Sequence, residues 1–330
     1  MKRNTLPCFI VLAAMWLGAT SPASAQSSAA SFPSKTVKIT APYSSGAGPA
    51  IFMRVMADKL SRAWGQPVIV DPRPGASGFI AIEAVKNAAP DGHEILVVSN
   101  AHVAINPALY KKLPYDPEKD FVPVARIYYT PFFITTATAG PYQTVPALVA
   151  AAKANPGKLS YGSSYVGSPS HLGGAEFEFL TGTRMIHVPY KEQSQMYAAI
   201  ANGDVGWAFS TLASALPLMK AGRLRLLAIA TKQRLKTQPD VPTVEEAGGP
   251  AGFVIDSWLA LLAPRGTPPE IVRRINAEVN KQLADPEVLD RMQFLGFEPA
   301  PSTPEQLGEL MRSDIKRYAE LVRRTGATAE

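Results

Sequence analysis

The sequence predicts an α/β fold built as two lobes. Apolar, strand-like segments alternate with helical segments of about 10–15 residues, which is the pattern of βαβ units with parallel strands. The chain has 330 residues, enough for two hydrophobic cores. Several of the expected strands end in turns rich in Gly, Ser or Pro, which connect a strand to the start of a helix.

The first elements follow directly from this alternation. Residues 36–42 (TVKITAP) predict a strand, and 49–64 has helical periodicity, with Ile51, Val55 and Leu60 among its apolar positions. Further along we expect strand 67–71, helix 79–87 and strand 93–99.

A second series begins with a strand at Phe132. It continues with strands at 159–164, 185–190, 206–210 and 224–231 and helices at 193–201 and 212–221. The chain then offers strand 256–264 and helices near 268–284, 286–295 and 303–325. We expect it to cross between lobes near 128–136 and again near 245–257. Lobe 1 is therefore expected to comprise 32–130 plus 252–330, and lobe 2 to comprise 131–251.

The N-terminus predicts export. Lys2 and Arg3 precede an apolar run, and a small-residue cleavage site ends at Ala25. Residues 1–25 are thus expected to be a cleaved signal peptide and 26–31 a linker, so the mature protein is expected to be exported. A buried N-terminal helix is the alternative. Cleavage would remove Cys8, the single cysteine, so no thiol chemistry is expected afterwards.

Composition narrows the possible partners. The chain is 46% hydrophobic and 18% charged, which is ordinary for a globular protein. Its net charge of +6 includes Lys2 and Arg3, and basic residues otherwise interleave with acidic ones. This favours solvated helix faces over nucleic-acid binding, while a mild positive field attracts small anions. We expect a monomer that needs no cofactor and no metal.

The first candidate loop is 42–49 (PYSSGAGP), between a strand and a helix. The unpaired N–H groups of a first helical turn can bind an anion, which selects Tyr43, Ser45, Gly46 and Ala47 as candidate ligand-binding residues. A purely structural turn is the alternative. A dinucleotide site is disfavoured because Ile51 replaces the third glycine of GxGxxG.

The second candidate loop is 161–172 (YGSSYVGSPSHL). Ser164, Gly167, Ser168 and His171 are its candidates, and Ser168 suits a helix N-cap. A packed or surface histidine is the alternative for His171. The GxSxG pattern of a nucleophile elbow is not satisfied, yet Ser168 or Ser164 with His171 leaves a secreted serine hydrolase as a remote possibility.

The remaining candidates also follow strands. They are Lys191 and Glu192 after one strand, Ser210 and Thr211 after another, and Asn100 after a third. Lys191 could equally be a surface charge, and Asn100 could simply cap its turn. Trp207 and Trp258 are expected to be core residues rather than stacking platforms.

Four short motifs resemble the Bug family, the periplasmic receptors of tripartite tricarboxylate transporters. They are VPYK (188–191), SALP (214–217), TKQR ending at Arg234, and PDVPTVEEAG (239–248). The resemblance covers about 32–326. It implies a type II periplasmic-binding-protein fold that closes on its ligand, each lobe being a mainly parallel sheet flanked by helices.

The resemblance also places the three loops on the ligand. Gly46, Gly167, Ser168, His171 and Lys191 match family positions. The departures are Ala47 for a glycine, Ala50 for an aspartate, Glu192 for a glycine, and Ser210–Thr211 for Asp-Asn. Because the acid is lost at 210, we expect a plain or hydroxylated carboxylate rather than an amino acid.

The expected function is therefore capture of a small organic carboxylate and its delivery to a tripartite tricarboxylate-type permease. A co-receptor that presents its closed form to a membrane sensor kinase is the alternative, since it would use the same ligand site. No catalytic residue is expected.

Overall fold

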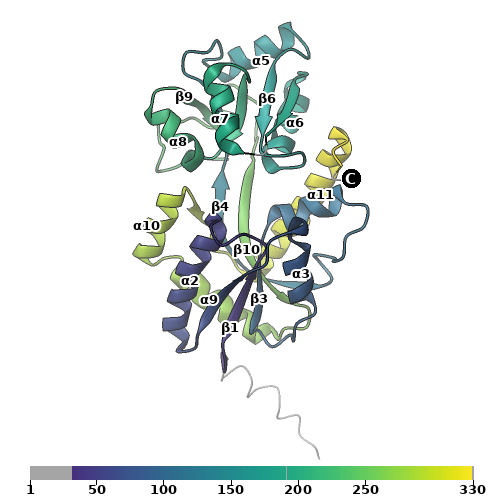
Figure 1. Ribbon diagram of the computed structural model, residues 1–330, viewed down its shortest axis with the longest axis vertical. Helices are drawn as coiled ribbons and strands as arrows, with labels where there is room; N and C mark the ends of the chain where they lie inside the picture. Colours follow the sequence, from purple (N-terminus) through teal and green to yellow (C-terminus); the bar gives the residue numbers. More distant parts are fainter. Residues whose placement is uncertain (1–31, 191, 329–330) are drawn as a thin grey trace, which may run out of the picture. The chain divides into compact units, whose positions relative to one another are not determined.

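Two β-sheets, each flanked by helices, make up the fold of the computed structural model, which describes residues 32–190 and 192–328. Contacts divide the chain after Phe32, and everything below concerns the unit Pro33–Glu330. The expected signal peptide and linker lie outside the described residues. We name the six-stranded sheet with its helices lobe 1 and the five-stranded sheet with its helices lobe 2 (Figure 1). The residue boundaries expected for the two lobes, 32–130 plus 252–330 and 131–251, remain a prediction from the sequence.

Lobe 1 has the strand order β11-β4-β10-β3-β1-β2. Its strands are β1 (Val37–Ala41), β2 (Val68–Pro72), β3 (Glu94–Ser99), β4 (Phe121–Pro131), β10 (Asp256–Pro264) and β11 (Glu298–Pro299). Its helices are α2 (Gly48–Trp64), η1 (Ala76–Gly78), α3 (Phe79–Lys86), the π-helical η2 (Ala101–Ile105), α4 (Asn106–Leu109), α9 (Pro269–Gln282), α10 (Pro286–Leu295) and α11 (Pro304–Thr325).

Lobe 2 has the order β7-β6-β8-β5-β9. Its strands are β5 (Phe133–Ala137), β6 (Ser160–Ser163), β7 (Ile186–Pro189), β8 (Trp207–Ser210) and β9 (Leu224–Ile229). Its helices are α5 (Val145–Ala154), α6 (Pro169–Thr181), α7 (Gln193–Asn202) and α8 (Leu212–Lys220). The sequence missed β4, α4, α5 and β11 and marked only the start of α6, while the expected strands and helices lie within a few residues of their predicted bounds.

The two sheets are mixed, which corrects the expectation of mainly parallel ones. The pairs β1–β2, β1–β3, β6–β7 and β6–β8 are parallel, whereas β10 runs antiparallel to β3 and β4, and β5 antiparallel to β8 and β9. The chain leaves lobe 1 along β4, enters lobe 2 at β5 after Phe132, and returns along β10 (Figure 1). Because the outgoing and returning strands are neighbours, they must point in opposite directions.

Each lobe has its own apolar core. Aromatic rings dominate that of lobe 2, where Phe177, Trp207, Phe209 and Phe253 contact one another. The core of lobe 1 packs α3 and α11 against the strands around Trp258. No helix of the described chain combines the length and apolar character needed to cross a bilayer.

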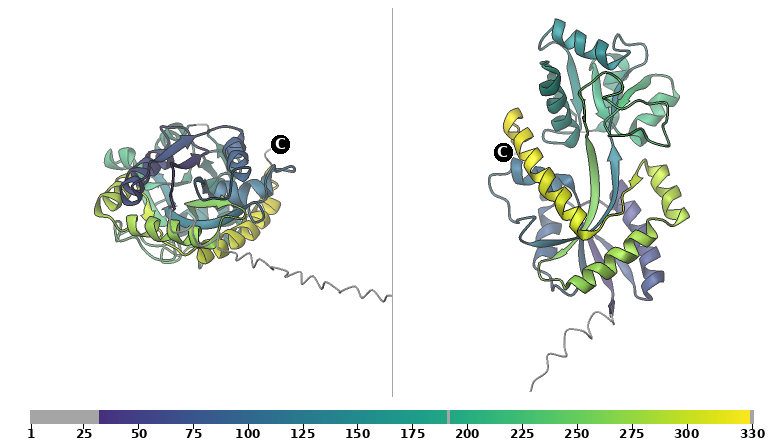
Figure 2. Two further views of the ribbon diagram at one scale, coloured as in Figure 1. Left: turned by 90° about the horizontal axis from the view of Figure 1, so that it is seen from below. Right: turned by 180° about the vertical axis from the view of Figure 1, so that it is seen from behind.

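Local sequence explains where α11 begins and ends. Thr303 accepts a hydrogen bond from the Gln306 N–H, and the Gln306 side chain accepts one from the Thr303 N–H, forming a capping box with Pro304 in the first turn. Gly326 ends the helix in the left-handed conformation. The helix then runs along the back of β4, and Figure 2 shows it from behind.

Candidate functional site

A cavity of about 640 Å³ lies between the two lobes. Six aromatic side chains form much of its wall: Tyr43, Tyr128, Phe132, Tyr165, Trp258 and Phe297. Tyr128 and Phe297 stack with ring centroids 3.9 Å apart. A space of this size and character suits a small organic molecule.

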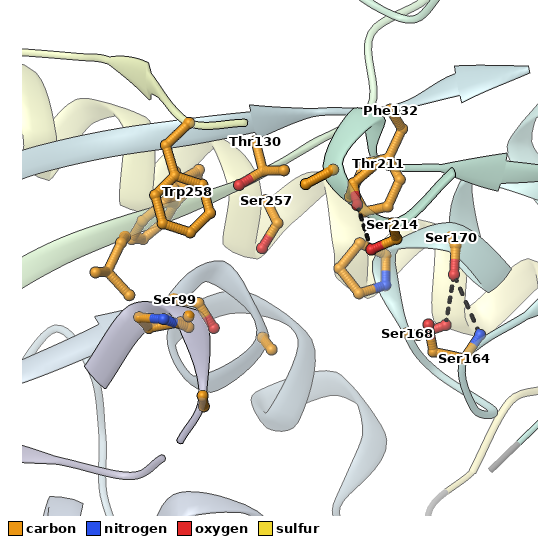
Figure 3. A pocket seen from close by; sticks show the side chains of 18 of the residues that line it. Ser99, Thr130, Phe132, Ser164, Ser168, Ser170, Thr211, Ser214, Ser257 and Trp258 are labelled. Carbon is orange, nitrogen blue, oxygen red and sulfur yellow. Dashed lines mark hydrogen bonds between the residues drawn. The ribbon is translucent and has the colours of Figure 1, made fainter. Parts of the chain in front are cut away.

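Hydroxyl groups face the cavity from both lobes (Figure 3). Lobe 1 contributes Ser99, Thr130 and Ser257, and lobe 2 contributes Ser164, Ser168, Ser170, Thr211 and Ser214. Among the described residues that line the cavity, every side chain is uncharged. These described residues can meet a charge on a ligand through dipoles and hydrogen bonds.

Helix N-termini supply such dipoles. The cavity wall includes residues of the first turns of α2, α6, α7 and α8, among them Gly48, Ser170, Gln193 and Ala213. Ser168 caps α6 by accepting a hydrogen bond from the His171 N–H, 3.2 Å away. None of the N-cap residues of α2, α7 and α8 makes a side-chain cap. Their first-turn N–H groups, with the positive end of the helix dipole, can bind an anion.

Five of the predicted site residues line the cavity, namely Tyr43, Ala47, Ser164, Ser168 and Thr211. Burial raises the pKa of the Tyr43 hydroxyl, so it stays protonated and can donate a hydrogen bond. Ser45 and Gly46 are exposed on the same loop but are not part of the wall. Glu192 is an exposed N-cap of α7 outside the wall, and Lys191 lies outside the described residues.

Asn100 and Ser210 lie behind the wall rather than on it. The Asn100 side chain donates to the Asp256 carbonyl at 3.0 Å and accepts a hydrogen bond from the Ser257 hydroxyl at 3.2 Å. It therefore orients a residue that does face the cavity. Ser210 is fully buried and hydrogen-bonded to Thr135 of the neighbouring strand. The expectation that position 210 presents its side chain to a ligand does not fit this placement.

Gly167 and His171 support the loop from behind. The Gly167 N–H donates to His171 Nδ1 at 2.9 Å, and the His171 ring stacks on His187 with centroids 3.8 Å apart. Burial lowers the pKa of each of these two histidines to about 4. Because Nδ1 of His171 already accepts a bond and Ser168 serves as a cap, this pair lacks the geometry of a nucleophile and its base.

Sequence reasoning missed the part of the lobe 1 wall that strands β4 and β10 form. Thr130 and Ser257 are register partners on β4 and β10, which brings their hydroxyls to one place. Trp258 is almost fully buried, as expected of a core residue, yet its ring also lines the cavity. In the sequence, the polar pair Asp256–Ser257 before the apolar run of β10 was the feature that could have indicated a cavity-facing residue here.

Together the two mixed α/β lobes and the cavity between them define a two-lobed solute-binding protein. A model of the tripartite tricarboxylate transporter family receptor matches residues 52–327, and the chain belongs to that family. BugT of Bordetella pertussis is 32% identical over 94% of this chain and 95% of its own length. A Pseudomonas sp. (strain P51) protein, encoded between tcbD and tcbE, is 33% identical over 94% of this chain and 93% of its own.

Solved structures agree with this assignment. An R. palustris protein with adipate is 32% identical, with a TM-score of 0.75, covering 90% of this chain and 99% of that one. MatC from Rhodopseudomonas palustris with bound malate is 29% identical, with a TM-score of 0.71, covering 88% and 100%. The predicted type II periplasmic-binding-protein fold is thereby confirmed.

Proposed function

We propose that this protein is a periplasmic receptor that captures a small organic carboxylate between its lobes and delivers it to a tripartite tricarboxylate-type permease. The observation that carries the proposal is the convergence of the uncapped N-termini of α2, α7 and α8 on a hydroxyl-rich cavity. Family membership and the adipate and malate held by two similar structures support it.

The available interactions suffice for useful affinity. Micromolar binding requires about 8 kcal/mol. A hydrogen bond to a charged group contributes about 1.5–3 kcal/mol, and a helix N-terminus adds about 0.3–1 kcal/mol, or up to ~2 when partly buried. Four or five such bonds reach the required value after ordering costs. An arginine clamp is not needed.

A ligand screen tests the proposal. We expect adipate, malate, citrate or benzoate to raise the melting temperature, with stabilisation of about 2.7 kcal/mol at 100 times Kd. Aspartate and glutamate should fail, because the described wall offers no acidic side chain to pair with their ammonium group. Folded protein that responds to no carboxylate would refute the proposal.

The variant Ala47→Asp tests the helix terminus itself. Aspartate is a favoured N-cap, so it should cap α2 and keep or raise the stability of the ligand-free protein. The same carboxylate would occupy the anion site, so affinity for the best carboxylate should fall at least about tenfold. Pro268→Asp places the same residue at the N-cap of α9, away from the cavity, and should leave affinity unchanged.

A further inference from the structure

We propose that Gln193 is a positioning residue that turns the Ser164 hydroxyl proton toward the ligand. This inference rests on the proposed function, since it assigns the orientation of one donor in that same site. Gln193 opens helix α7, and its side chain bridges two parts of the cavity wall that are distant in sequence.

A directed series of hydrogen bonds passes through this amide. The Thr211 hydroxyl donates to Ser214 Oγ at 2.9 Å, where Figure 3 shows the bond, and Ser214 donates to Gln193 Oε1 at 3.1 Å. On the other side, Gln193 Nε2 donates to Ser164 Oγ at 3.2 Å. The series therefore runs from Thr211 through Ser214 and Gln193 to Ser164.

The amide sets the direction because its two ends differ. A hydroxyl can donate or accept, whereas an amide accepts only at oxygen and donates only at nitrogen. Ser164 Oγ receives a bond from Gln193, and its own proton has no partner among the residues that the structure describes. That proton is available to an acceptor in the cavity.

The resulting site prefers a ligand that accepts at this point. A carboxylate oxygen can take the Ser164 proton, whereas an ammonium group has no lone pair to offer. Successive bonds in one direction also polarise each other, which strengthens the last donor. Ser164 would then add to the donors supplied by the N-termini of α7 and α8.

The role is positioning rather than structural because the Gln193 side chain is exposed. Its removal leaves no cavity in the core and no buried polar atom of its own unpaired. The melting temperature of the ligand-free protein should therefore not change. A residue that merely held α7 in place would lower it.

A double-mutant cycle tests the coupling. Adipate, malate and benzoate are titrated by calorimetry into the full-length mature protein, and the tightest binder is carried through the set. We expect Ser164→Ala and Gln193→Ala each to weaken it about tenfold, equal to about 1.4 kcal/mol. The double variant should be no weaker than Ser164→Ala alone, because Gln193 acts through Ser164.

Two further variants sharpen the test. Gln195→Ala removes an exposed amide two residues along the same helix and should bind as the wild type does. Gln193→Glu keeps the shape but has no N–H to donate, so Ser164 would turn its proton to the new carboxylate. The variant should bind more weakly than Gln193→Ala, since it also adds a negative charge beside an anionic ligand.

The outcomes distinguish a failure of the Gln193 role from a failure of the proposed carboxylate binding. Wild-type protein that binds none of the three carboxylates would overturn both. Wild-type binding that is unaffected by Gln193→Ala, or additive losses in the double variant, would overturn the inference alone. Additive losses would mean that Gln193 contacts the ligand independently of Ser164.

Discussion

At the scale of single residues, the polar side chains of the site form two tiers. Ser164, Ser257 and Thr211 face the cavity, while Asn100 holds Ser257 from behind and His171 holds the backbone of the 161–172 loop at Gly167. The second tier is buried and its partners are within the protein. Its substitution should therefore change affinity through the orientation of its neighbours rather than through lost ligand contact.

Buried neutral histidines make stability depend on pH. Burial lowers the pKa of His102, His171 and His187 to about 4, whereas an unfolded histidine titrates near 6.5. Between these values the unfolded chain binds more protons, so stability is full above pH ~6.5 and falls as the pH drops toward 4. His102, which is 8% exposed, should account for up to about 3 kcal/mol.

Urea unfolding at pH 7, 5.5 and 4.5 measures this dependence. His102→Asn should flatten the slope across that range, although the variant starts from a lower stability. NMR titration provides the control, because each of the three imidazoles should titrate near 4. Titration near 6.5 would contradict the account.

At the scale of elements, helix α6 depends on glycines for its close approach to the sheet. Gly174 lies against the Tyr161 ring of β6, and Gly173 against Ile255, which a Cβ on Gly173 would meet at 2.5 Å. No side chain fits at either position without moving these neighbours. The approach keeps the N-terminus of α6, with its cap Ser168, at the cavity.

Gly174→Ala should therefore destabilise the fold. The added methyl group must displace the Tyr161 ring, which costs about 1–3 kcal/mol for an overpacked core. Gly308→Ala is the matched control, since a Cβ there meets Arg312 and Pro123 only at 3.4 and 3.5 Å in helix α11. Gly308→Ala should be neutral or stabilising by up to ~1 kcal/mol. Equal effects in thermal unfolding would contradict this reading.

The elements themselves were largely predictable, because their periodicity and caps are local properties of the sequence. For example, Pro304 after Thr303 indicated the start of α11, and an apolar run indicated strand β10. The site was less predictable because it depends on pairing. Thr130 meets Ser257 only through the register of β4 and β10, and strand alternation turns Ser210 toward Thr135 while the next residue, Thr211, reaches the cavity.

At the scale of the whole molecule, the two lobes touch at two places where a glycine of one lobe meets the other. Gly167 of lobe 2, at φ 83°, lies against Leu109 of lobe 1, and Gly296 of lobe 1 lies against Ala213 of lobe 2. A Cβ would meet Leu109 at 2.5 Å at Gly167, which excludes a side chain unless Leu109 moves, and Ala213 at 3.3 Å at Gly296, which is a tight contact. The two glycines let the lobes approach without a side chain between them.

Gly167→Ala should impair closure. A Cβ would stand 2.5 Å from Leu109 Cδ1, and the left-handed backbone disfavours alanine by about 1–2 kcal/mol. We expect the best carboxylate to bind about tenfold more weakly by calorimetry. Gly167→Ala with Leu109→Ala should recover part of the loss, since the second change makes room. No recovery would show that backbone strain alone is responsible.

The uncharged wall of the cavity has a consequence for unloading. A site that holds its anion with an arginine leaves a buried cation unpaired when the anion departs, and that penalty opposes release. Here the described wall presents only hydroxyls, rings and helix ends, which water can solvate once the lobes part. When a bound anion departs, none of these described wall residues is left with an unpaired charge, so this part of the site does not oppose release.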